Sequence, residues 1–134
     1  MFAFSLFVLT PREARTIIKL STLAPKDSSY HQALVRMGQE WKRITGGKVD
    51  VIVYAGGIQG GESAMIRRMR VGQLQSALLT GVGLSEIESS VAGLQSIPMM
   101  FRDFDEVDHV GSVLHGKLEE LFEEKGLKVL FWTD

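Results

Sequence analysis

The acidic residues and the histidines are the first candidates for catalysis or metal binding in this sequence. The three histidines are His31, His109 and His115, and the spacing of the last two puts them on different faces of a helix. The carboxylates at residues 103–108 precede an apolar helical pattern and are interpreted as first-turn charges that complement the helix dipole. The sequence therefore predicts no catalytic residue, no metal site and no enzymatic turnover.

A glycine-rich stretch at residues 54–61, with the sequence YAGGIQGG, is the second candidate for chemistry. It joins an expected strand to an expected helix, where backbone N–H groups could hold an anion. It matches neither the Walker motif nor the dinucleotide-binding fingerprint, because the glycine spacing differs and no Gly-Lys-Ser/Thr follows. Two interpretations stay open, a tight turn that needs positive φ and a loop that faces a ligand.

The strands and helices that must position these residues alternate along the chain. Apolar runs with strand character occupy residues 17–22, 49–54, 76–79 and 127–131. Apolar residues at helical spacing occupy residues 29–44, 62–71, 84–95 and 104–125, and Trp41 is expected on the buried face of the first helix. The alternation predicts the α/β class, with a mostly parallel sheet flanked by helices.

Length, charge and cysteine content narrow the class of protein. The chain has 134 residues, of which 45% are hydrophobic, as expected for one globular domain. The formal net charge of -1 shows no basic excess, so a nucleic-acid partner is not expected. The sequence has no cysteine, which excludes disulfides and thiolate metal sites.

Residues 1–16 are expected to lie outside the folded domain. An apolar run from Met1 to Leu9 is followed by Arg12 and Ala14. The run is too short to span a membrane, and it resembles the end of a secretory signal without the usual basic start. A shortened signal peptide and an apolar N-terminal tail both remain open as interpretations.

Six segments, in this order and spacing, carry a resemblance to a known family. They are residues 18–25 (IKLSTLAP), 41–49 (WKRITGGKV), 54–62 (YAGGIQGGE), 69–75 (MRVGQLQ), 94–101 (LQSIPMMF) and 124–132 (EKGLKVLFW). Each segment is short, but their combination is specific. From about residue 17 to its end, the chain resembles the DctP family, the extracytoplasmic receptors of TRAP transporters.

The resemblance implies a type II periplasmic-binding-protein fold, in which two α/β lobes close on a ligand. Residues 17–134 are expected to form the first lobe only and to be incomplete, because the family's carboxylate-binding arginine and second lobe lie in a later part. The implied partners are a small organic acid and the membrane permease subunits of a TRAP transporter. The implied location is the periplasm, and no cofactor is implied.

The resemblance also implies which residues face the ligand: Leu23, Ala24, Glu62, Thr80 and Trp132. Most follow the ends of expected strands, and the carboxyl ends of parallel strands are where α/β sheets bind ligands. Leu23 and Gly83 stand where acid-sugar-binding relatives have polar or charged groups, so a sialic-acid-like ligand is not expected. Sheet edges left unpaired in an incomplete lobe are expected to favour self-association.

Two other functions remain open. A phosphate- or nucleotide-binding domain would use the glycine-rich loop, and it would need a phosphate-binding lysine or a ribose-binding acid that the sequence does not place suitably. The effector-sensing half of a cytoplasmic regulator would need a DNA-binding helix-turn-helix upstream, whereas only an apolar tail precedes Ile17.

We expect no micromolar binding of ATP or NAD, because the glycine-rich loop lacks the residues that hold a nucleotide phosphate or ribose. Isothermal titration calorimetry of the 134-residue chain with each nucleotide checks this. Saturable heat in the micromolar range with either one would favour the nucleotide-binding alternative.

Overall fold

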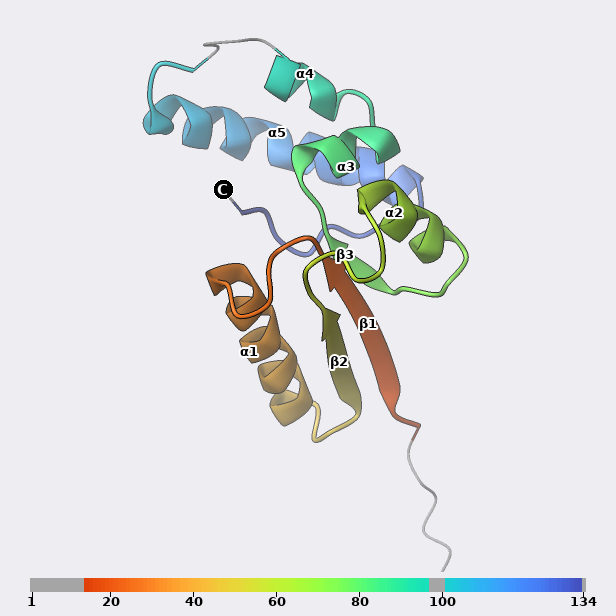
Figure 1. The fold of residues 1–134 in the computed structure, drawn as a ribbon. Helices are drawn as coiled ribbons and strands as arrows, with labels where there is room; N and C mark the ends of the chain where they lie inside the picture. The colour runs from red at the N-terminus through yellow and green to blue at the C-terminus, as the bar shows by residue number, and fades with distance from the viewer. Residues whose placement is uncertain (1–13, 97–100, 134) are drawn as a thin grey trace, which may run out of the picture.

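A computed structural model describes residues 14–96 and 101–133 of the chain (Figure 1). Residues 1–13 of the expected tail at residues 1–16 lie outside these ranges, as do residues 97–100. Strands and helices alternate in the first part, and three helices follow. The elements are β1 (Thr16–Thr22), α1 (Ser29–Ile44), β2 (Val49–Tyr54), α2 (Glu62–Arg70), β3 (Ser76–Leu78), α3 (Gly81–Ile87), α4 (Val91–Ser96) and α5 (Phe104–Glu124).

The described strands form one parallel sheet in the order β2-β1-β3. β1 is central, and Leu20 in it lies opposite Val53 of β2 and Ser76 of β3. The carboxyl ends of the described strands therefore lie at the same edge of the sheet. Helices α3, α4 and α5 lie beyond this edge (Figure 1). The prediction of a parallel α/β sheet flanked by helices is confirmed.

Local sequence signals explain where the longer helices begin and end. The Ser28 hydroxyl accepts from the backbone N–H of His31 at 3.3 Å and caps α1. Asp103 caps α5 in the same way, through the N–H of Glu106 at 2.9 Å. Gly46, which follows α1, has a φ of 60°, a backbone conformation that glycine adopts without steric cost. None of the described helices is long and apolar enough to cross a membrane.

The main hydrophobic core lies between α5 and the helices α2 to α4. Phe122 and Leu118 of α5 are buried against Ile66, Ile87 and Val91. Helix α1 approaches β2 so closely that a Cβ on Gly38 would lie 2.9 Å from the Cβ of Val51. Glycine at this position therefore sets how near helix and sheet can pack.

An ion pair joins the α3–α4 turn to the end of α5. Lys125 Nζ lies 3.2 Å from Glu88 Oε2, and the backbone N–H of Ser90 donates to Glu88 Oε1 at 3.0 Å. The bond from Ser90, helped by Lys125, holds the pKa of Glu88 below its usual value. The stabilisation is therefore present at neutral pH and is lost as the pH falls through that lowered pKa.

Three expectations about elements are wrong or only partly correct. The single helix at residues 84–95 is two helices, α3 and α4, because the Thr80 hydroxyl caps a helix that starts at Gly81 and Glu88 adopts an extended backbone. The strand at residues 127–131 is not formed, because this segment is held by side-chain packing on the core rather than by a backbone ladder. Trp41 is half-buried rather than buried.

Phe122 and Phe104 provide a matched test of the core, since both lie on α5 but are 1% and 86% exposed. Phe122→Ala should lower the free energy of unfolding by about 3–5 kcal/mol through lost burial and cavity formation. Phe104→Ala should change it by less than about 0.5 kcal/mol. Urea denaturation followed by far-UV circular dichroism measures both, and similar losses would contradict this placement of α5.

Candidate ligand-binding site

The glycine-rich loop folds back on the end of β1. The backbone N–H groups of Gly56 and Gly57 donate to the carbonyl oxygens of Ala24 and Thr22 at 2.8 and 3.0 Å. Both glycines have positive φ, 68° and 70°, which turns the chain towards β1. A Cβ on Gly57 would lie 3.2 Å from Leu23 Cδ2, so the Leu23 side chain lies close to the loop backbone.

These bonds distinguish between the two interpretations of the glycine-rich loop. The N–H of Gly60 donates to the carbonyl oxygen of Gly57 at 2.8 Å, so three of the glycine amides are used inside the fold. They are not available to a phosphate group, which such loops bind through free backbone N–H groups. The geometry supports the tight turn and gives no support to the phosphate- or nucleotide-binding alternative.

Glu62 and Thr80 form a hydrogen-bonded pair between α2 and the end of β3. Glu62, the first residue of α2, is only 8% exposed. Its Oε2 accepts from the Thr80 hydroxyl at 2.8 Å, and its Oε1 accepts from the backbone N–H of Thr80. A carboxylate removed from water needs such partners, so Glu62 is a fixed structural acceptor rather than an open charge.

Gly83 lies directly against this pair. A Cβ at position 83 would be 2.9 Å from Glu62 Cδ and 3.0 Å from its Oε2. Since real Cβ atoms do not approach that closely, the carboxyl group occupies the space that a side chain at position 83 would need.

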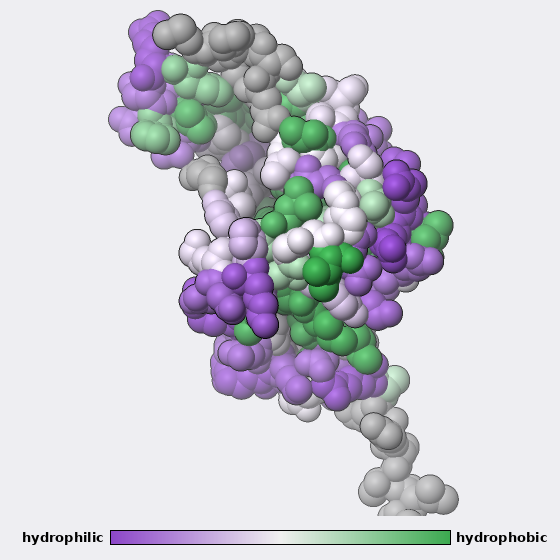
Figure 2. Space-filling model, in the orientation of Figure 1, coloured by the Kyte–Doolittle hydropathy of each residue, from purple (hydrophilic) through white to green (hydrophobic). Residues whose placement is uncertain are grey.

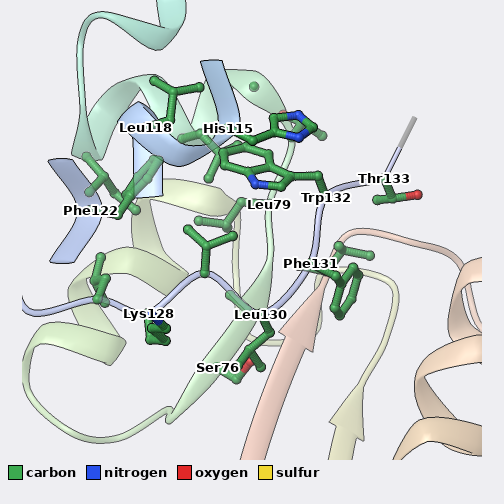
Figure 3. A pocket seen from close by; sticks show the side chains of 18 of the residues that line it. Ser76, Leu79, His115, Leu118, Phe122, Lys128, Leu130, Phe131, Trp132 and Thr133 are labelled. Carbon is green, nitrogen blue, oxygen red and sulfur yellow. The ribbon is translucent and has the colours of Figure 1, made fainter. Parts of the chain in front are cut away.

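Trp132 stacks on His115 of α5 (Figure 3) and also donates a hydrogen bond to that helix. Its ring lies parallel to the His115 ring, with centroids 4.7 Å apart, and Phe122 packs against it at a tilt, 6.4 Å away. Trp132 Nε1 donates to Glu119 Oε1 at 3.0 Å. These contacts anchor residues 127–133 to the helix in the absence of strand pairing.

An apolar hollow, whose lining includes Leu20, Trp41, Leu79, Thr80, Phe131 and Trp132, runs from the face of the sheet to this terminal segment. Figure 2 shows hydrophobic side chains gathered over the middle of this face of the molecule. Leu79 lies beside the Trp132 ring, whereas Phe131 points away towards the end of β1 (Figure 3).

The five expected ligand-facing residues thus fall into three groups. Leu23 and Ala24 contact the glycine-rich loop at the end of β1. Glu62 and Thr80 bond to each other. Trp132 shares the lining of the hollow with Thr80. Across the part of the chain that the structure describes, no three His, Asp or Glu side chains are grouped so that they could hold a metal ion.

The sequence did not predict the contacts that Gly83, His115 and Glu119 make. No local pattern reveals these contacts, because each depends on a partner from another element or from the terminal segment. The glycine-rich run in the sequence indicates that Gly57 lies in a turn, but it does not predict the contact of Gly57 with Leu23.

Solved structures with this arrangement are periplasmic solute-binding proteins of TRAP transporters. One from a Polaromonas species, bound to D-erythronate, has a TM-score of 0.78 and 25% identity, over 90% of this chain and 40% of that one. One from Roseobacter denitrificans, bound to L-galactonate, matches in fold with a TM-score of 0.73 and 23% identity, over 84% and 37% of the two chains. The fold of this chain therefore matches part of a lobe in these solute-binding proteins.

The sequence comparison identifies the family. Residues 20–134 match DctP, bacterial extracellular solute-binding protein, family 7, and the chain belongs to this family of receptors. A solute-binding protein of Roseobacter denitrificans is 28% identical over 95 residues, which are 71% of this chain and 29% of the relative. The chain thus spans well under half the length of these relatives.

Gly60 and Gly46 allow a test of the loop that borders this site. Both have positive φ, but a Cβ on Gly60 would lie 2.8 Å from Ala64 Cβ, whereas nothing lies within 4 Å of one on Gly46. Gly46→Ala should cost about 1–2 kcal/mol of stability from backbone strain. Gly60→Ala should cost about 1–3 kcal/mol more, because it adds a steric clash. Equal melting temperatures for the two variants would show that the loop is not packed against α2.

Proposed function

We propose that this chain forms one wall of the ligand-binding site of an extracytoplasmic receptor for small organic acids, which delivers its ligand to TRAP permease subunits. The observation that carries the proposal is the family match over residues 20–134. That span contains the end of β1, the strands β2 and β3, the glycine-rich loop, the Glu62–Thr80 pair and Trp132. These features lie at or beyond the carboxyl ends of parallel strands, where α/β sheets bind ligands.

The ligands named for structural relatives support an organic acid as the ligand class. D-erythronate, L-galactonate and succinate are bound in three of them, and all carry at least one carboxylate. In our proposal, Leu23, Ala24, Thr80 and Trp132 line the ligand side of this lobe. Glu62 supports them from behind, since both of its carboxylate oxygens already accept hydrogen bonds from Thr80.

Several further properties belong to this proposal. The receptor binds and releases its ligand without chemical turnover, as the other members of a receptor family do. It works in the periplasm, with residues 1–16 as a shortened signal peptide or an apolar N-terminal tail. The outer edges of β2 and β3, which no described strand pairs, make self-association of this chain favourable.

We expect the 134-residue chain to bind mono- and dicarboxylates no more tightly than the millimolar range, which corresponds to about 4 kcal/mol. A single lobe covers only one side of a ligand, whereas receptor sites bury most of the ligand surface by closure of two lobes. Calorimetry or NMR titration against a panel of acids measures the affinity.

A chimera carrying the remaining lobe of the Polaromonas relative is the matched comparison, and it should bind at least one acid far more tightly. Micromolar binding by the 134-residue chain alone would mean that a complete site lies within it. No binding of any acid by either protein would contradict the proposed function.

A further inference from the structure

In the proposed site, neighbouring residues already use most of the hydrogen bonds that the Thr80 hydroxyl can make. Its side chain is exposed and borders the apolar hollow. Its Oγ lies 2.8 Å from Glu62 Oε2 and 3.3 Å from the backbone nitrogen of Val82. A threonine hydroxyl has one hydrogen to donate and two lone pairs that can accept.

These two neighbours determine the direction of the hydroxyl hydrogen. An ionised carboxylate can only accept, so Thr80 Oγ donates its hydrogen to Glu62. The Val82 N–H can only donate, so it uses one lone pair of Oγ. The other Glu62 oxygen accepts from the Thr80 backbone N–H, and this second bond holds the carboxylate in place.

What remains on Thr80 for a ligand is therefore one acceptor lone pair and no donor. Among the described residues, Glu62 and Val82 are the hydrogen-bond partners of Oγ. A hydroxyl group on a ligand can donate to the remaining lone pair. A carboxylate or carbonyl oxygen placed there would instead face a second oxygen with no hydrogen between them.

We infer that Glu62 is a positioning residue that fixes the polarity of the Thr80 hydroxyl, so that Thr80 selects acids carrying a hydroxyl group over those carrying a carbonyl group at the same carbon. The inference rests on the proposed function and specifies its ligand class. Sites built to pair with one hydrogen-bonding group discriminate against analogues that lack it, because a polar group is then left unpaired.

Gly83 is the third member of this arrangement. A Cβ at this position would come within 3.1 Å of three Glu62 side-chain atoms. Alanine at position 83 therefore displaces the carboxylate from Thr80 and leaves both hydrogen-bonding side chains chemically intact. The Gly83→Ala variant therefore tests the geometry of the Glu62–Thr80 pair without changing either of these two residues.

The test compares two pairs of stable five-carbon acids, 2-hydroxyvalerate with 2-oxovalerate and 4-hydroxyvalerate with 4-oxovalerate. Amide chemical shifts of the 134-residue chain are followed by NMR, which detects millimolar binding. We expect the chain to bind the hydroxy acid of at least one pair about fivefold or more tightly than its oxo partner, the effect of one hydrogen bond.

Glu62→Gln should reduce this preference to about twofold or less, or reverse it. A glutamine amide can accept from the Thr80 N–H and donate to Thr80 Oγ, which turns the hydroxyl hydrogen outward to meet a carbonyl oxygen. Gly83→Ala should reduce the preference as well, and it decides the question if Glu62→Gln does not fold by circular dichroism.

Glu86→Gln is the matched control, because Glu86 Oε1 accepts from the Ser63 hydroxyl in a similar pair on the same two helices. It should leave the preference unchanged. Equal binding of hydroxy and oxo acids by the parent chain would overturn the inference and leave the proposed function intact. So would a preference that survives in a folded Glu62→Gln or Gly83→Ala variant. No binding of any of the four acids would overturn the inference, whereas the proposed function fails only if the chimera also binds no acid.

Discussion

β1 lies in the middle of the described sheet, and the remaining structure depends on its backbone hydrogen bonds. It pairs with β2 along six residues and with β3 along three. Just beyond the ladder, the carbonyl oxygens of Thr22 and Ala24 accept from the glycine-rich loop. One strand therefore sets the register of its neighbours, the start of α2 and the position of Leu23 at the carboxyl edge of the sheet.

The Glu62–Thr80 pair connects the two helices that follow this sheet edge. Burying a carboxylate is costly unless its oxygens are hydrogen-bonded, and both Glu62 oxygens find their donors on Thr80. The same contact holds the α3 N-terminus against the α2 N-terminus, with Gly83 leaving the necessary space. Glu62 therefore joins α2 to the start of α3 and also fixes one hydrogen bond of the exposed Thr80 hydroxyl.

The apolar hollow has a different physical basis. Its lining comes from the sheet face, α1, α5 and the terminal segment, and most of its side chains are apolar. Trp132 lies at one side of it, fixed by His115 and Glu119. Aromatic stacking and this indole hydrogen bond add to the packing of Leu127 and Val129 on the core. Together they hold a segment that has strand-forming residues but no strand partner in the described part of the chain.

Local signals in the sequence were enough to predict most of the elements. Ser28 and Asp103 cap helices through bonds to residues three positions away, and apolar spacing indicates the face of α5 on which Leu118 and Phe122 are buried. The family segments, read together, also predicted the parallel α/β lobe. Such features depend on neighbours in the chain, so a sequence reveals them directly.

Only the tertiary structure decided how the candidate site residues are used. Glu62 and Thr80 are eighteen positions apart. No periodicity in the sequence predicts that the Glu62 carboxylate accepts a hydrogen bond from the Thr80 hydroxyl. The expected strand at residues 127–131 had the right composition, but a strand also needs a partner ladder, and Leu127 and Val129 pack on the hydrophobic core instead. Hydrogen-bond partners and packing contacts between distant segments are set by the fold as a whole, which is why the residue types were evident in advance and their roles were not.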